Sequence, residues 1–282
     1  MFYRTHAEIY VPDRTPEKEA LARTTHLGIG AHADDLEIMA YHGIAECYRR
    51  KTRWFTSITC GDGAGSPRNG PYERMKLGQF KETRRREQRS AARIGRYSAA
   101  IQLDYPSAEI RNLRNGNIRS DLTTVLLRTR PRWIYTHNLA DRHETHLAVV
   151  LHVLEALRSL GPKGWPRRLY GCEVWGSLDW LPGSQKVALD CSKHPLVSRK
   201  LLQVFRSQIG SGKRYDLATL GRRQANATYH HSESADAARG ITFAMDLMPL
   251  LRNRRLNPLR YVSYMVERLE RDLLSPLRAL RS

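Results

Sequence analysis

The sequence predicts an α/β protein with a Rossmann-like, mostly parallel sheet and helices on both faces of that sheet. Short apolar segments rich in β-branched and aromatic residues recur along the first 160 residues, and segments with helical periodicity separate them. Strands that alternate with helices at this spacing are typical of parallel βαβ units. A chain of 282 residues is long enough for one such domain with added elements.

The expected elements of the first half follow one another regularly. Residues 1–22 are polar and irregular, and we expect them to form an arm on the domain surface. Gly95 and Gly161 stand where two of the helices should end. The expected strands are residues 25–31, 54–60, 97–105 and 132–136, and the expected helices are residues 36–50, 76–95, 122–128 and 147–160.

This alternation is lost after residue 165, where we expect a C-terminal strand and helix elaboration. Its strands are expected at residues 169–175 and 187–191, and its helices at residues 195–208, 216–228 and 261–280. The last helix places Val262, Met265, Leu269 and Leu273 on one face, a stripe that we expect to pack against the core. Without a repeat or a low-complexity linker, we expect residues 1–282 to be a single domain, with its core at about 25–160 and the elaboration at about 165–282.

Composition predicts a cytoplasmic protein without a membrane span. Hydrophobic residues make up 41% of the chain, but no apolar run approaches the roughly 20 residues that cross a bilayer. The N-terminus has no apolar segment of the kind a signal peptide needs. The four cysteines are widely spaced and form no C-x-x-C pair, which is typical of reduced residues.

The net charge of +19 needs an explanation, because a basic surface attracts nucleic acid, anionic membranes or acidic substrates. The arginines are dispersed, and neither a basic tail nor a nucleic-acid-binding motif accompanies them. This pattern favours an arginine-rich or oligomer-forming surface over nucleic-acid binding. A basic nucleic-acid-binding protein without catalysis remains an alternative.

The first polar cluster follows the expected strand 25–31 directly. His32 and Asp35 are three positions apart, so a helix starting there would point both side chains the same way. Their nitrogen and oxygen atoms are two of the ligands that a catalytic zinc usually takes. Asp34 lies between them and would be free to act as a base. A helix N-terminus capped by acids is the alternative, although capping does not require the histidine.

The second polar cluster follows the expected strand 132–136 and contains His137, Asp141, His143 and His146. Ligands of open parallel sheets bind beyond the carboxyl ends of the strands, near the point where strand order reverses. The first and fourth strands are often neighbours there, so the two clusters can meet and complete a His, Asp, His set with an open position. The His143 and His146 pair lacks the zincin spacing, and one of them can lie outside the metal ligands.

Taken together, the segments 30–37 and 136–146 resemble the PIG-L/LmbE-like family of zinc-dependent N-acetylglucosaminyl deacetylases, which carry A-H-P-D-D-x-E and H-x-D-H strings. The loop at 59–63 and the Arg84-x-x-Glu87 pair also fit, so the resemblance spans about residues 25–160. It implies a hydrolase of linear amide bonds that removes the N-acetyl group of an amino sugar or glycoconjugate by metal-activated water. The implied cofactor is Zn²⁺, with another divalent ion as the alternative.

The resemblance also implies roles for individual residues. The implied zinc ligands are His32, Asp35 and His146. Asp34 would be the general base, and His143 would stabilise the oxyanion or protonate the leaving amine. Ala33 stands where the family has proline, so the loop is less fixed in φ. Thr145 stands where the family has aspartate, which leaves Glu144, Asp141 or no residue to orient His143. The expected substrate-binding residues are Arg84, Asp62, His137, Asp141 and Trp175.

The C-terminal part is expected to shape the substrate pocket. Trp175 and Trp180 suit either stacking on a sugar or plain core packing. The segments 207–215 and 221–226 would line the rim of the pocket or form a homo-oligomer contact. Arginines around an acidic centre suggest a substrate with a phosphate or carboxylate. A metal-dependent amidohydrolase acting on a non-sugar amide, such as a cyclic imide or an acyl amino acid, is the enzymatic alternative.

Overall fold

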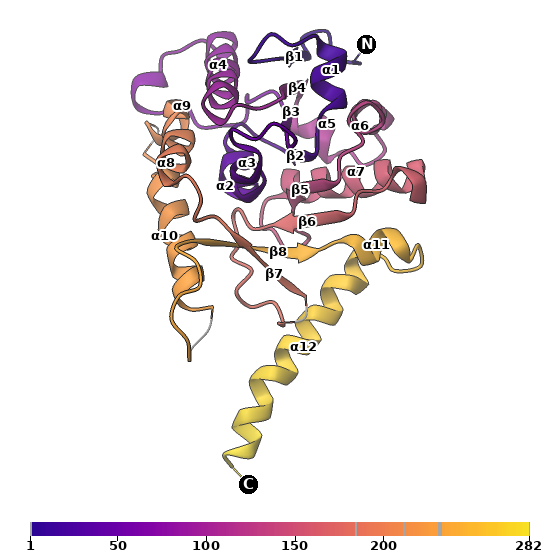
Figure 1. The fold of residues 1–282 in the computed structure, drawn as a ribbon, viewed down its shortest axis with the longest axis vertical. Coiled ribbons are helices and arrows are strands. Elements are labelled where there is room, and N and C mark those ends of the chain that lie inside the picture. Colours follow the sequence, from indigo (N-terminus) through magenta and orange to yellow (C-terminus); the bar gives the residue numbers. More distant parts are fainter. Residues whose placement is uncertain (1, 184, 211, 231–232, 282) are drawn as a thin grey trace.

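One sheet of eight strands forms the centre of the protein in the computed structural model, which describes residues 2–183, 185–210, 212–230 and 233–281 (Figure 1). The strands are β1 (Glu8–Tyr10), β2 (His26–Gly30), β3 (Phe55–Gly61), β4 (Ala99–Tyr105), β5 (Trp133–His137), β6 (Arg168–Cys172), β7 (Lys186–Asp190) and β8 (Ile241–Asp246). Their order across the sheet is β1-β4-β3-β2-β5-β6-β8-β7. The sheet therefore joins strands from both halves of the chain.

The middle of the sheet is parallel, as expected. Strands β4, β3, β2, β5 and β6 pair in parallel, whereas β1, β8 and β7 are added in antiparallel pairs. The predicted α/β class with a mostly parallel sheet is confirmed. Strand β2 pairs with β3 on one side and with β5 on the other, so strand order reverses between β2 and β5.

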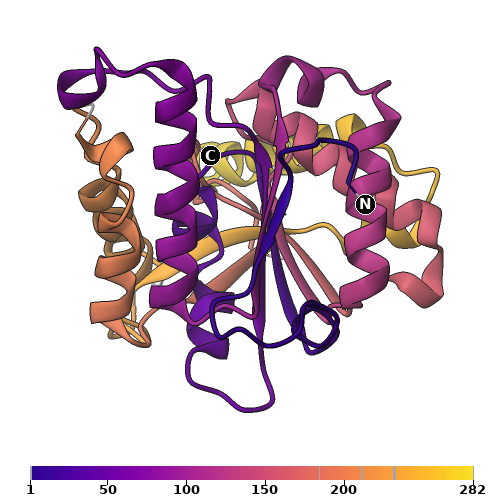
Figure 2. The same ribbon diagram turned by 90° about the horizontal axis from the view of Figure 1, so that it is seen from above.

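Helices cover both faces of the sheet (Figure 2). One buried cluster includes Ile29, Ile101 and Val149 beneath α6 and α7, and the other includes Leu36 and Tyr41 beneath α2, α3 and α4. The helices are α1 (Glu17–Ala22), α2 (Asp35–Met39), α3 (Tyr41–Cys47), α4 (Leu77–Gly95), α5 (Ser107–Arg111), α6 (Gly116–Thr129), α7 (Glu144–Leu160), α8 (Pro195–Gln203), α9 (Arg206–Ile209), α10 (Tyr215–Thr228), α11 (Met248–Arg252) and α12 (Pro258–Ala279), with 3₁₀ turns η1 (Gly70–Tyr72) and η2 (Pro162–Gly164).

Several regions differ from the sequence-based expectation, among them the single helix expected at 195–208, which is the two helices α8 and α9. Residues 1–22 contain β1 and α1, where we expected an irregular arm. Strand β1 forms because it pairs with β4, and its own three residues are too few to show a periodic pattern. Strand β8 was not expected, although residues 241–246 are rich in β-branched and aromatic residues. The single helix expected at 36–50 is two helices, α2 and α3, which meet at Ala40.

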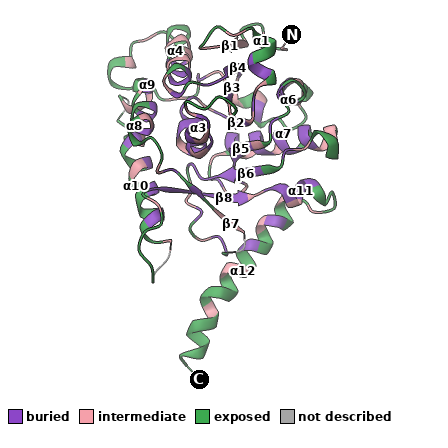
Figure 3. Ribbon diagram, viewed as in Figure 1, coloured by how far each residue is buried: buried purple, intermediate pink, exposed green. Residues whose placement is uncertain are grey.

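Helix α12 projects from the body of the protein (Figure 1), and most of its surface is exposed (Figure 3). The expectation that its apolar stripe packs against the core holds only near its start, where Tyr261 and Met265 are buried. Leu273 is 60% exposed, because the helix has left the body by that point. Among the helices of the described residues, none combines the length and apolarity that crossing a bilayer requires.

Glu37 is a buried carboxyl on α2, next to the first polar cluster. Its Oε1 atom accepts hydrogen bonds from the Tyr97 hydroxyl at 2.8 Å and from Gln88 Nε2 at 3.0 Å. Burial raises the pKa of Glu37 to about 7, against the lowering effect of these hydrogen bonds. The folded protein therefore holds this carboxyl in its neutral form at pH values where the unfolded chain ionises it.

We expect Glu37 to make stability fall as pH rises from about 4.5 to about 7, because the unfolded state loses its proton first in this range. Across the window, Glu37→Gln should gain at most about 3 kcal/mol in unfolding free energy relative to wild type. Urea denaturation at a series of pH values measures this. Glu82→Gln, at a half-exposed glutamate of α4, is the control and should give a flat difference. A flat difference for Glu37→Gln would contradict the prediction.

Candidate metal centre and active site

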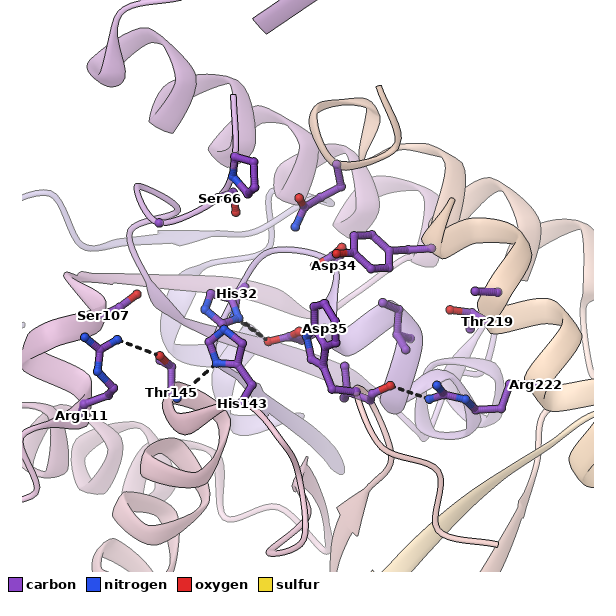
Figure 4. Close-up of a pocket in the computed structure, with 18 residues that line it drawn as sticks. His32, Asp34, Asp35, Ser66, Ser107, Arg111, His143, Thr145, Thr219 and Arg222 are labelled. Carbon is purple, nitrogen blue, oxygen red and sulfur yellow. Dashed lines mark hydrogen bonds and ion pairs between the residues drawn. The ribbon is translucent and has the colours of Figure 1, made fainter. Parts of the chain in front are cut away.

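The two polar clusters meet where strand order reverses. Gly28 of β2 pairs with Tyr135 of β5, so the loops that follow these strands lie side by side. His32 comes from the loop after β2 and Asp35 from the start of α2, while His146 lies in the first turn of α7. Figure 4 shows His32 and Asp35 beside His143 in this region.

The geometry of three donor groups fits a divalent metal ion. His32 Nδ1 lies 3.1 Å from His146 Nε2 and 3.4 Å from Asp35 Oδ2. His146 Nε2 lies 3.5 Å from Asp35 Oδ1. Ligand atoms at 2.0–2.1 Å around a tetrahedral zinc ion are about 3.3 Å apart. The set His32, Asp35 and His146 that the sequence implied therefore has suitable spacing for such an ion.

Two more histidines lie within reach of this centre, in overlapping groups that share His146. His137 Nε2 accepts the backbone N–H of Ala31 at 2.9 Å, so its lone pair is already used. His143 is the N-cap of α7, and its Nδ1 accepts the backbone N–H of Thr145 at 3.2 Å. These contacts favour His32 and Asp35, together with His146, as the ligand set.

Neighbouring charges set the protonation of the ligands. Burial alone would raise the pKa of Asp35, but His146 and His137 outweigh it and hold this pKa well below its usual value. Burial likewise opposes charging of His146, and the carboxylates of Asp35 and Asp141 overcome it and raise that pKa. Asp141 Oδ1 lies 3.2 Å from His146 Nδ1, the arrangement by which a carboxylate orients a metal-binding histidine.

Asp34 occupies a strained turn beside the ligands. Its φ of 89° lies in the left-handed region, which is uncommon for a residue other than glycine. Burial, followed by the charge of Asp35, raises the pKa of Asp34 well above its usual value, and the positive charge of Arg84 opposes this rise. The side chain of Asp34 makes no cap hydrogen bond to α2, so helix capping does not explain this aspartate.

A cavity of about 400 Å³ opens over the centre, a size that suits a small-molecule ligand. His32, Asp34, Asp35 and His143 line it, and so does Trp175, which is 45% exposed (Figure 4). The two expected rim segments contribute Gln208, Tyr215 and Arg222, while Ser211 lies outside the described residues. Sequence reasoning missed Ser66, Ser107, Arg111 and Thr219 on this wall.

Four of the expected substrate-binding residues lie behind the cavity wall rather than on it. His137 is fully buried, and Asp141 accepts the backbone N–H of His143 at 2.9 Å. Asp62 pairs with Lys81 at 2.8 Å. Arg84 is 2% exposed, and its Nη2 donates to the Ala33 carbonyl at 3.2 Å. None of these four side chains lines the cavity, and the bonds of Arg84 and Asp141 act on the turn and the histidine that do line it.

The fold and the centre together define an α/β protein with a candidate His–Asp–His metal site at the strand-order reversal. Residues 27–157 match the family model of PIG-L, described as GlcNAc-PI de-N-acetylase. The resemblance of this chain to the PIG-L family is thereby confirmed. A search of curated proteins gave no significant match.

Several solved structures share the fold. N,N′-diacetylchitobiose deacetylase from Pyrococcus horikoshii is 14% identical, with a TM-score of 0.62, over 86% of this chain and 90% of that chain. GalB, the 4-carboxy-2-hydroxymuconate hydratase from Pseudomonas putida, is 17% identical, with a TM-score of 0.59, over 79% and 95%. The zinc-inhibited form of teicoplanin deacetylase Orf2 is 15% identical, with a TM-score of 0.53, over 79% and 98%. At such low identity these similarities show the fold alone.

We expect Asp35→Ala to abolish tight binding of a divalent ion, because it removes a central donor of the set. Asp141→Asn should retain binding but weaken it by about 10- to 100-fold, the usual effect of losing the carboxylate behind a metal-binding histidine. Titration calorimetry with Zn²⁺ and Co²⁺ measures both. His6→Gln, at an exposed histidine of the N-terminal segment, is the control. Wild-type affinity in Asp35→Ala would contradict the assignment.

Proposed function

We propose that this protein is a metal-dependent hydrolase that removes the N-acetyl group from an N-acetylated amino sugar or its conjugate. The observation that carries the proposal is the close approach of donor atoms from His32, Asp35 and His146, next to a cavity that His32, Asp34 and Asp35 line. The PIG-L match and the fold shared with deacetylases support it. Fold alone does not decide a reaction, since a hydratase shares it.

We propose that His32, Asp35 and His146 hold the ion, which is zinc or another divalent metal. When bound, such an ion polarises a carbonyl oxygen and lowers the pKa of water to about 7. The nitrogen and carboxylate donors suit zinc. Other divalent ions stay in consideration because one similar structure is described as zinc-inhibited.

Asp34 is the general base of the proposed reaction. It lines the cavity beside the ligand set, and burial next to the charge of Asp35 raises its pKa, which makes its carboxylate a stronger base. Its carboxylate takes the proton of the water that attacks the acetyl carbon. Arg84 is a positioning residue in this scheme, because its hydrogen bond to the Ala33 carbonyl holds the turn that carries Asp34.

His143 supplies a hydrogen-bond donor for the oxyanion. Its Nδ1 accepts a backbone N–H, so the neutral ring carries its proton on Nε2. Burial, together with the neighbouring His146 and His32, lowers the pKa of His143 and keeps the ring neutral at pH 7. The Nε2–H of this neutral ring suits stabilisation of the tetrahedral intermediate, and the proton that Asp34 took from the water then passes to the leaving amine.

Trp175 is the proposed stacking surface for the sugar. It lines the cavity, with its ring centroid 6.0 Å from that of Tyr215 in an edge-to-face arrangement.

Three expectations stay predictions: the single domain over residues 1–282, a cytoplasmic location and a homo-oligomer. The sheet shared by both halves supports the first, and the exposed apolar residues of α12 offer a surface for the last.

We expect Asp34→Asn to bind its metal ion like wild type and to release acetate about 10²- to 10⁴-fold more slowly, because the amide cannot accept the proton. Metal content and acetate release, measured on the same preparations, test this. The control is Asp13→Asn, which makes the same chemical change at an exposed aspartate. Unchanged turnover in Asp34→Asn would mean that another group is the base.

A substrate panel tests the reaction class. Metal-loaded enzyme should release acetate from N-acetylglucosamine or N,N′-diacetylchitobiose, or from conjugates of these sugars. Opening of cyclic imides or cleavage of acyl amino acids, without acetate release from sugars, would favour the non-sugar amidohydrolase. Salt-dependent retention on DNA by protein that binds no metal would favour the nucleic-acid-binding alternative.

A further inference from the structure

One end of the cavity carries a positive charge that the proposed chemistry does not use. Arg111, the last residue of α5, lines this end together with the hydroxyl groups of Ser107 and Ser66 (Figure 4). Thr145 lies next to Arg111 and belongs to the same first turn of α7 as His146. The positive charge is therefore close to the ligand set and faces the same space.

The Arg111 guanidinium is only weakly neutralised. Its Nη1 lies 3.5 Å from Thr145 Oγ1, at the long limit of a hydrogen bond. Its Nε lies 3.7 Å from the carboxylate of Glu144, whose side chain is 85% exposed. An ion pair this long and this exposed contributes little. Most of the five N–H donors of the guanidinium are thus available to a ligand.

Two other arginines near the centre, Arg222 and Arg84, already donate to backbone carbonyls within the described part of the chain. Arg222, at the opposite end of the cavity, donates to the Val174 carbonyl. Arg84 is buried and donates to Ala33. Asp34 and Asp35, the carboxylates of the cavity wall, lie on the side of the ligand set. Arg111 therefore faces an end of the cavity with hydroxyl groups but no carboxylate on its wall.

Such a wall fits an anion with several oxygen atoms. The planar fork of a guanidinium binds phosphate or carboxylate through two parallel hydrogen bonds, and serine hydroxyls can donate to the remaining oxygens. We propose that Arg111, Ser107 and Ser66 form a subsite for an anionic group, a phosphate monoester or a carboxylate, carried by the substrate. The claim that this substrate also presents an N-acetylated sugar to the ligand set rests on the proposed function. The claim that the subsite binds an anion is independent of that function.

Binding measurements on the full-length protein test the subsite independently of turnover. Titration calorimetry compares neutral N-acetylglucosamine with its 1-phosphate, its 6-phosphate and the carboxylate-bearing N-acetylmuramic acid. At least one anionic sugar should bind about tenfold or more tightly than the neutral sugar, and the three arms identify the group and its position. Arg111→Gln should weaken binding of that anionic sugar by about 10- to 100-fold, the usual range for a charged hydrogen bond, and leave the neutral sugar unchanged.

Two further variants separate the subsite from general basicity. Arg111→Lys keeps the charge without the fork and should fall between wild type and Arg111→Gln. Arg142→Gln removes an exposed arginine near the site and should change nothing. With an active enzyme, Arg111→Gln should raise KM for the anionic sugar at constant kcat, because the contact is the same in ground state and transition state.

Each outcome decides one claim. Anionic sugars that bind in an Arg111-dependent manner but release no acetate would support the subsite and count against the deacetylase. Equal affinity of wild type for neutral and anionic sugars, including failure to bind either, would overturn the subsite. A preference for anionic sugars that survives in Arg111→Gln would overturn it as well.

Discussion

The parallel pairing of β2 with β5 is the constraint on which the rest of the site depends. These strands are more than 100 residues apart in the chain, and their pairing is what brings His32 and Asp35 to His146. The chain runs from β2 to β3 on one side and from β5 to β6 on the other side. These two connections therefore diverge and leave a crevice between the loops that follow β2 and β5. The donor atoms, the base and the cavity all lie at this one crevice.

Two adjacent aspartates with opposite pKa shifts then divide the chemistry. Asp35 faces two histidines and keeps its charge, whereas Asp34 is buried next to that charge and holds its proton more tightly. In the proposed function the same pair of side chains supplies a ligand and a base, a division that environment rather than residue type would create. Arg84 and Asp141 maintain it from behind the wall, where one bonds the strained turn and the other orients both histidines.

Most of the cavity wall comes from elements that are not part of the ligand motifs. Helices α5 and α10, with the segment after β6, surround the centre with arginine, hydroxyl and aromatic groups. The charge of Arg111 is only weakly neutralised, because the side chain beside it is the uncharged Thr145. Where the family string has an aspartate, the same guanidinium would face a carboxylate. In the proposed subsite, this uncharged neighbour leaves Arg111 to select substrates that carry an anionic group.

The sequence by itself determined the α/β class and most of the core strands, and it predicted the ligand set, because each of these is encoded within a few consecutive residues. Periodicity is local, and both polar clusters follow directly after strands. Tertiary structure alone decided that β1 and β8 join the sheet, since edge pairing with distant strands supplies their hydrogen bonds. It also decided that Arg84 and His137 are buried while Arg111 faces the cavity. Burial depends on which distant segments pack around a side chain, and no local pattern in the sequence records that.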